Sequence, residues 1–318
     1  MRTKAHGHGV VIVSLVFSVP LVAGACSVGA VRVRSAPSST SRSSSPSTTT
    51  PVTTPTTSPP LDQSGWTPVS YGILGIAVDE RTVTNGDGSR ITVARFHAGQ
   101  VRFAIHVGSQ DPPSGGATVG AESGPSVSAT ERPLLLAAFN GGFKISSGSG
   151  GVEVDNQVLS PLVVGRASFV IDSDGSGHVG VWGEDLPMPG ERVLSVRQNL
   201  LPLISGGKLS PDISNIGAWG ATLANATVAA RSSLGEDAAG NIFYAASMFA
   251  LPVDLGDALI AAGAVRAMQL DINPEWVQLA LAPSAGAPLV AAIPGQNRPA
   301  DQYLVGWTRD FVTVVAVG

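Results

Sequence analysis

The sequence predicts a strand-rich α+β domain with a mixed sheet and a few packed helices, and three observations lead to this fold class. Most apolar segments are short and are separated by Gly, Asn, Asp and Pro, which is typical of strands joined by turns. One segment near residue 255 instead repeats its apolar residues at helical spacing. Hydrophobic residues make up 43% of the 318 residues, which is enough for a sizeable core.

The first strands are expected around turn-forming pairs. Asn85-Gly86 and Asp87-Gly88 lie between the segments YGILGIAV and RITVARFH, so a hairpin is expected there. A second hairpin is expected where SDGSGH joins ASFVID to VGVWG. Between the two, VRFAIHV alternates with period two, which places His106 on one face of a strand, and LLLAAF forms another strand.

The C-terminal half is expected to contain one helix between strands. ATVAARSSLGEDAAGNIFYAAS predicts two strands around a turn at 237–241. PVDLGDALIAAGAV predicts the helix, because Leu255, Leu259 and Ile260 recur near helical spacing and Gly263 can end it in a left-handed conformation. RAMQL follows as a strand, and YLVGW and FVTVVAV are expected to be the last strands.

The N-terminus has the features of a secretion signal. Arg2 and Lys4 precede an apolar run that is short for a membrane-spanning helix, so residues 1–25 are interpreted as a lipoprotein-type signal peptide. Its end, VAGAC, resembles a bacterial lipobox, in which Cys26 receives a lipid. Ala23 stands where leucine is usual, which leaves ordinary cleavage and free secretion as the alternative.

Residues 26–60 are expected to be a disordered tether that carries the lipid anchor. They are rich in Ser, Thr and Pro and cannot bury enough apolar surface to offset the entropy of ordering. Residues 61–318 remain for one folded domain. The protein is therefore expected to be exported and either anchored to the outer face of the cell membrane or secreted.

Charge and cysteine content exclude several classes of function. The net charge is -4 and no basic stripe is present, which argues against a nucleic-acid partner. Cys26 is the only cysteine, so the domain has no disulfide, cysteine nucleophile or cysteine metal site. The sequence also lacks the G-x-S-x-G elbow, the P-loop and the dinucleotide-binding glycine motif.

The sequence contains no strong metal-binding pattern, and no cofactor is expected. Binding of a divalent cation remains the alternative. His97, His106 and His178 are far apart and lack the spacing of a zinc motif. The segment DSDG at 172–175 is partly similar to a calcium loop but lacks the other ligands, so a hairpin turn is expected there.

The first polar cluster that follows an apolar strand is FNGGFK. Gly141 and Gly142 allow a sharp turn, whose N–H groups can form an anion-binding concavity beside Asn140 and Lys144. A plain Asn-Gly-Gly turn is the alternative.

Two further clusters place polar residues within apolar strands. Gln198 and Asn199 precede a Leu/Ile run, where an ordinary strand entry is the alternative to a ligand site. Arg231 lies in an otherwise apolar strand, where an unpaired cation would be costly to bury. It is expected to point to solvent or to meet a carboxylate or phosphate.

The fourth cluster follows the strand RAMQL. Asp271, Asn273 and Glu275 alternate, and Pro274 favours an extended Asn273, so the three side chains could share one direction. Trp276 closes the segment. A strand-ending turn with solvated carboxylates is the alternative.

The order of four motifs resembles that of the phosphodiester glycosidase family. The motifs are NGGF at 140–143, an apolar run ending in GGK at 203–208, RSSLGEDAAGNIFY at 231–244, and the strand ending in Asp at 267–271. The resemblance spans 134–281. This chain departs from the family pattern after the Asp, where INPEW replaces a Gly- and Ser-rich tail, and Lys replaces the second Phe of the first motif.

The resemblance implies hydrolysis of a sugar 1-phosphodiester. In that reaction Arg231 and the Asn140-Gly141-Gly142 turn would stabilise the phosphate, because guanidinium and backbone N–H groups suit an anion. The resemblance also implies that Asp271 would act on the anomeric side of the sugar.

The remaining candidates would assist at the same site. Glu275 would be a second catalytic carboxylate, and Trp276 would stack on the sugar or lie in the core. Lys144, Asn199 and Asn273 would contact the substrate. The alternative functions are a lipoprotein that binds an envelope glycan or glycophospholipid without catalysis, and a structural envelope lipoprotein.

Overall fold

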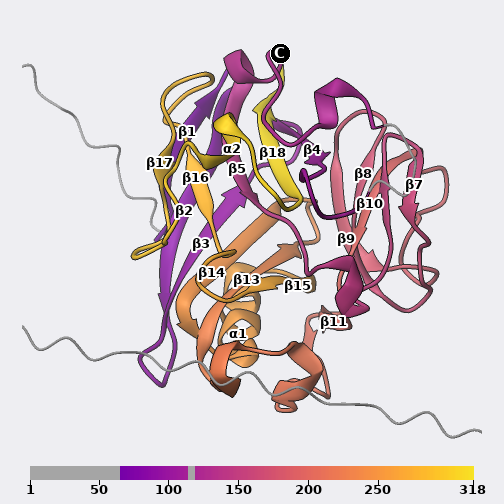
Figure 1. The fold of residues 1–318 in the computed structure, drawn as a ribbon. Helices are drawn as coiled ribbons and strands as arrows, with labels where there is room; N and C mark the ends of the chain where they lie inside the picture. The colour runs from indigo at the N-terminus through magenta and orange to yellow at the C-terminus, as the bar shows by residue number, and fades with distance from the viewer. Residues whose placement is uncertain (1–64, 114–118) are drawn as a thin grey trace, which may run out of the picture. The chain divides into compact units, whose positions relative to one another are not determined.

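A computed structural model of the protein describes residues 65–113 and 119–318, which belong to one compact unit. The signal peptide, Cys26 and the tether expected for residues 1–60 lie outside the described residues. Three β-sheets form the framework of the described chain (Figure 1).

The largest sheet has eight strands and carries the segment that ends in Asp271. Its strands, in order across the sheet, are β1 (Thr67–Gly72), β2 (Gly75–Thr84), β3 (Arg90–Phe96), β14 (Ile242–Ala250), β13 (Ala229–Glu236), β15 (Arg266–Ile272), β11 (Pro202–Ser205) and β12 (Lys208–Leu209).

The other two sheets have five strands each. One runs in the order β7 (Gln157–Ser160), β6 (Val152–Val154), β10 (Val193–Gln198), β8 (Ala167–Asp172) and β9 (Gly177–Val181). The other runs in the order β17 (Val290–Ala291), β16 (Leu279–Leu281), β5 (Leu135–Asn140), β18 (Phe311–Ala316) and β4 (Val101–His106).

All neighbouring strands of these sheets pair antiparallel, so the mixed sheet predicted from the sequence is not found. The described residues contain two α-helices, α1 (Pro252–Ala262) and α2 (Gln302–Val305). The described chain is therefore mostly β, and the prediction of several packed helices is corrected. Neither helix has the length and apolar character needed to cross a membrane.

The three sheets share one core. A chain of aromatic rings runs through it from Phe169 to Phe103 (5.5 Å), Phe96 (5.8 Å), Phe139 (5.9 Å) and Tyr244 (5.0 Å). These five rings come from all three sheets and are buried. Ring contacts at these separations add to the burial of apolar area, so the rings hold the sheets together.

Helix α1 covers the opposite face of the largest sheet, against β3 and β14 (Figure 1). Leu255 and Leu259 are fully buried there beside Phe243. Asp254 accepts the Leu251 N–H at 2.7 Å, which satisfies one donor at the start of the helix. Gly263 ends it with a left-handed φ of 104°. This is the helix that the spacing of apolar residues predicts.

The two predicted hairpins are present, and two strand predictions are wrong. β2 and β3 meet at the Asn85–Gly88 turn, and β8 and β9 meet at the SDGS turn. YGILGIAV is not one strand, because the chain reverses between Gly72 and Gly75. YLVGW forms α2 instead of a strand, and this turn buries Tyr303 against Phe311 at a ring separation of 4.5 Å. So short an apolar run does not distinguish the two conformations locally.

Candidate active site

A cleft of about 400 Å³ lies where β15 ends. Its lining includes Phe143, Lys144, Gly220, Asp271, Asn273, Trp276 and Arg309. This volume is typical of sites for small molecules. A larger cavity, of about 490 Å³, lies beside β3 and β14, but Arg90 is its only ionisable lining residue. The cleft at the end of β15 is therefore the better candidate for chemistry.

Asp271 is the only carboxylate among the residues that line this cleft. Its Oδ2 lies 3.0 Å from Nη2 of Arg309, and its Oδ1 accepts the Ile272 N–H at 2.8 Å. Burial raises the pKa of Asp271 to about 7, and the attraction of Arg309 offsets only part of that rise. Asp271 can therefore gain and lose a proton near neutral pH.

Arg309 joins both sides of the cleft floor. Besides Asp271, its Nη2 donates to the Gly142 carbonyl at 2.8 Å. Its guanidinium carbon lies 4.9 Å from the ring centroid of Trp276, which is a cation–π distance. Its Nε lies 3.4 Å from Asp111 Oδ2 but makes no hydrogen bond among the described residues, so that contact is an ion pair only.

Asp310, the next residue, occupies the turn that the sequence suggests for an anion. The Gly141 N–H donates to the Asp310 carbonyl at 3.0 Å, and the Gly142 N–H donates to Asp310 Oδ2 at 3.2 Å. A Cβ on Gly141 would lie 2.0 Å from that same oxygen. The prediction of an open anion-binding concavity at this turn is corrected, because a protein carboxylate already fills it.

Asn140 lies behind the cleft, almost fully buried, and connects three segments. Its Nδ2 donates to Ser232 Oγ at 2.9 Å, and its Oδ1 accepts the Tyr244 hydroxyl at 2.7 Å and the Gln278 N–H at 3.2 Å. Ser232 Oγ in turn donates to the Asp271 carbonyl at 3.0 Å. Asn140 thus positions the end of β15 and does not line the cleft.

Asn199 also acts as a connector. It is fully buried, and its Nδ2 donates to the carbonyls of Gln269 and Leu270 at 2.7 and 2.6 Å. Its Oδ1 accepts the Phe143 N–H at 3.3 Å. Asn199 fixes the loop after β5 onto β15 and leaves no polar atom of its side chain for a substrate.

Arg231 does not share the cleft with Asp271, and the expectation that it binds the phosphate there is corrected. Its side chain is fully buried, and its guanidinium donates to the Ala250 carbonyl at 3.2 Å, the Trp219 carbonyl at 3.3 Å and Gln269 Oε1 at 3.0 Å. Burial lowers its pKa to about 10. Arg231 supports the Trp219 segment that precedes Gly220 of the cleft wall.

The INPEW segment divides between the cleft and the surface. Asn273 lines the cleft with a left-handed φ of 76°, not the extended conformation expected before Pro274, and its Oδ1 accepts the Leu223 N–H at 3.0 Å. Glu275 does not line the cleft; it pairs with Arg298 at 2.5 Å, and its side chain is 46% exposed. Trp276 does line the cleft.

The structure thus brings Lys144, Asp271, Asn273 and Trp276 to one cleft and leaves Arg231 and Glu275 outside its lining. Arg309 also lines this cleft, and the sequence analysis did not single it out. A charged Arg-Asp pair directly before the strand FVTVVAV was a usable signal, since charges at a strand end are where polar sites form. Arg197, which binds Asp310 at 2.7 Å, was missed too, although it lies in an apolar strand as Arg231 does.

Three solved structures are distantly similar to this chain. The catalytic domain of zebrafish N-acetylglucosamine-1-phosphodiester alpha-N-acetylglucosaminidase, auto-inhibited by its pro-peptide, matches 76% of this chain and 82% of its own chain at 15% identity, with a TM-score of 0.48. A hypothetical protein from Synechocystis matches 76% of this chain and 62% of its own at 14% identity, with a TM-score of 0.49. A Burkholderia pseudomallei protein described as exported matches 71% and 74% at 12% identity, with a TM-score of 0.37.

Comparison by sequence adds no assignment. A scan against models of protein families finds no match, and a search of curated proteins finds none either. The three structural matches have TM-scores below 0.5 and assign no role to the cleft, so the site is interpreted from its own geometry.

Proposed function

We propose that this protein hydrolyses a sugar 1-phosphodiester at the cell envelope. The observation that carries the proposal is the contact of Asp271 with Arg309 at the floor of the cleft. It combines a carboxylic acid that titrates near neutral pH with a cation, and Lys144 adds a second cation to the lining. The order of the motifs from NGGF to Asp271 also supports this reaction.

The proposed chemistry follows from the leaving group. A phosphate leaves without being protonated first, so one carboxylate can suffice where ordinary glycosides need two. Asp271 in its ionised form takes a proton from water, and the water oxygen bonds to the anomeric carbon. The bond from that carbon to the bridging oxygen breaks, and its electron pair leaves with the phosphate.

The other cleft residues bind the substrate. Lys144 and Arg309 offset the charge of the phosphate, which grows as the bond breaks. Trp276 offers an aromatic face to the sugar, and Asn273 offers a polar edge. Arg231, Asn140 and Asn199 act by holding the strand and loops that carry these groups.

The test is a hydrolysis assay of the full chain on a panel of sugar 1-phosphodiesters, with free sugar as the readout. Asp271→Asn should abolish turnover while the protein stays folded. Asp174→Asn is the matched control, because Asp174 lies in an exposed turn and its side chain bonds only Ser176 among the described residues. Equal turnover in wild type and Asp271→Asn would exclude Asp271 as the base.

A second candidate, binding of a glycophospholipid without catalysis, is favoured by a neighbouring apolar groove. This groove, of about 400 Å³, meets the cleft at Asn273 and includes the exposed side chains of Leu223, Val228 and Phe249. A polar cleft beside an apolar groove suits a ligand with a headgroup and a lipid chain. Under this candidate a lipid-linked sugar phosphate binds and is recovered intact, and Phe249→Ser weakens its binding.

Export and anchoring form the remaining part of the proposal. The apolar run that ends in VAGAC and the Ser/Thr/Pro-rich segment after it support a lipid on Cys26. This arrangement would hold the cleft outside the membrane, where envelope sugar phosphates occur.

A further inference from the structure

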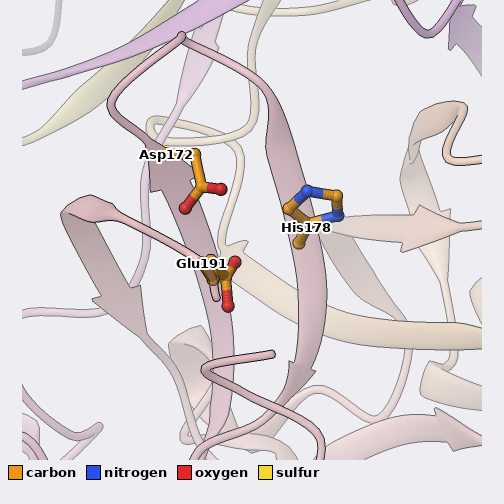
Figure 2. Close-up of side chains that lie close together, drawn as sticks. All are labelled: Asp172, His178 and Glu191. Carbon is orange, nitrogen blue, oxygen red and sulfur yellow. The ribbon is translucent and has the colours of Figure 1, made fainter. Parts of the chain in front are cut away.

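A second group of ionisable side chains lies at the other end of β15 from Asp271. Asp172 ends β8, His178 lies in β9, and Glu191 lies in the loop before β10. One atom able to bind a metal in each residue lies within 4.8 Å of the other two. Figure 2 shows the imidazole of His178 across from the two carboxyl groups.

A buried carboxylate fixes the orientation of His178. Glu236, which is 3% exposed, has its Oε1 at 3.1 Å from His178 Nδ1, and its Oε2 accepts the Val179 N–H at 2.9 Å. An imidazole that donates one ring N–H to a carboxylate presents its other nitrogen as a metal ligand, and metal-bound histidines commonly have such a partner. Nε2 of His178 is therefore the available ligand atom.

The two facing carboxyl groups each keep a buried oxygen without a partner. Asp172 Oδ1 and Glu191 Oε1 make no hydrogen bond among the described residues. The other oxygen of Glu191 accepts the Met188 N–H, which fixes that side chain. Buried polar atoms without partners are rare and call for an explanation, and two of them face one imidazole here.

We propose that Asp172, His178 and Glu191 bind a divalent transition-metal ion of the Zn²⁺ type. A nitrogen and two carboxylate oxygens suit Zn²⁺, whereas Ca²⁺ and Mg²⁺ select sets of oxygen ligands. The ion would join the β8–β9 hairpin to the loop before β10, so its role would be structural. The site shares no residue with the cleft, and the proposal is independent of the proposed hydrolysis.

Sequence spacing could not reveal this set. The three residues are separated by 6 and 13 positions, and none of them is part of a recognised zinc motif. The hairpin brings the first two together, and the return of the chain toward β10 adds the third. The competing explanation is that His178 is protonated and is itself the counter-ion of the acidic groups.

The test is a Zn²⁺ titration of the full chain after treatment with a chelator, with calorimetry and elemental analysis of the dialysed protein. The chain also contains His6, His8 and Cys26, so the readout is the difference between variants. Asp172→Asn, His178→Gln and Glu191→Gln should each lose one Zn²⁺ per chain, or weaken that site at least about ten-fold.

Two matched controls should retain the site. Asp174→Asn removes a carboxylate from the same hairpin turn, and His97→Gln removes a histidine that contacts a different carboxylate, that of Asp79. Because His178→Gln also leaves Glu236 without its imidazole partner, folding is checked by thermal unfolding without metal. If that variant is unfolded, Asp172→Asn and Glu191→Gln decide.

Two outcomes separate the explanations. Zn²⁺ that raises the unfolding temperature of the wild type and of both controls, but not of Glu191→Gln, supports the site. Equal stoichiometry and affinity in the wild type and the ligand variants would overturn it and leave His178 as the internal counter-ion.

Discussion

The Asp271 carboxylate and the Arg309 guanidinium meet at the floor of the cleft, 3.0 Å apart, although they belong to different sheets. Asp271 lies in β15 of the largest sheet, and Arg309 lies just before β18 of a five-stranded sheet. The site is therefore built at the junction of two sheets. Its geometry depends on the buried contacts that hold those sheets together, and these contacts can be tested separately from activity.

Asp271 should make the folded state less stable as the pH rises. Its folded pKa of about 7 lies above its unfolded value, so between about pH 4 and 7 only the folded state holds the proton. Stability then falls through this range, because the folded state binds more protons than the unfolded state. Asp271→Asn removes this loss of stability, so the variant should be more stable than wild type at pH 8. The gain should be a few kcal/mol at most, since one pKa unit corresponds to about 1.4 kcal/mol.

Urea unfolding at pH 4.5 and pH 8 measures the effect of this substitution. The difference between Asp271→Asn and wild type should be large at pH 8 and small at pH 4.5. Asp174→Asn provides the comparison, since that side chain is exposed. An Asp271→Asn protein that is less stable than wild type at pH 8 would mean that the contact with Arg309 outweighs the cost of burial.

Gly141 should not tolerate a side chain. A Cβ there would lie 2.0 Å from Asp310 Oδ2 and 2.9 Å from the Asp310 carbonyl oxygen. Gly141→Ala should therefore lower the free energy of unfolding by about 2–3 kcal/mol, as overpacking does in other cores. Gly86→Ala is the control, because its Cβ would meet nothing within 4 Å. Chemical denaturation measures both, and equal stabilities would contradict the close approach.

The Arg197–Asp310 ion pair should matter far more to stability than the Arg298–Glu275 pair. Both side chains of the first pair are at most 2% exposed, and they lie 2.7 Å apart. Removing one partner by Arg197→Met leaves a buried charge and should cost about 3–5 kcal/mol. Glu275→Gln breaks a pair whose side chains are 33% and 46% exposed, and it should cost about 0–1 kcal/mol. Similar losses in the two variants would refute this ranking.

Lys144 should contribute to binding more than to stability. Its side chain is exposed and lines the cleft, so Lys144→Met removes a cation without disturbing the core. With a sugar 1-phosphodiester that is turned over, we expect KM to rise about ten-fold, which corresponds to about 1.4 kcal/mol. Lys208→Met changes an exposed residue of β12 outside the cleft lining and should leave KM unchanged. A fall in kcat with unchanged KM would instead place Lys144 in the chemical step.

Local signals predicted the hairpins and helix α1, because turn residues and helical spacing act within a few positions. The antiparallel pairing of the strands was harder to predict from the sequence. The sequence predicts that a strand, β15, follows α1, and it predicts a mixed sheet, but β13 lies between β14 and β15 and pairs antiparallel with both. The strand order depends on contacts far apart in the sequence, and no local pattern contains it.

Arg231 shows how far the sequence can predict the contacts of a candidate site residue. The sequence allowed two outcomes for a cation in an apolar strand, exposure or an ionic partner. The structure has a third, in which carbonyl groups and the Gln269 amide satisfy most of the guanidinium. Arg231 even pairs with Ile272, next to Asp271, but a β-bulge follows in β13 and its side chain is directed to Trp219. Register and bulges decide such directions, and they are set by the whole sheet.

Cys26 should determine whether the protein is held at the membrane. The sequence around it predicts lipidation, and the residue lies outside the described part of the structure. In a bacterial host, the wild type should partition with membranes and incorporate a labelled fatty acid, because two or more acyl chains give stable anchoring. Cys26→Ser should remove the label. Ser27→Ala, at the adjacent position, should keep it. A wild type found unlabelled and only in the medium would show that ordinary cleavage and secretion occur instead, and a labelled Cys26→Ser protein would show that the lipid is attached at another residue.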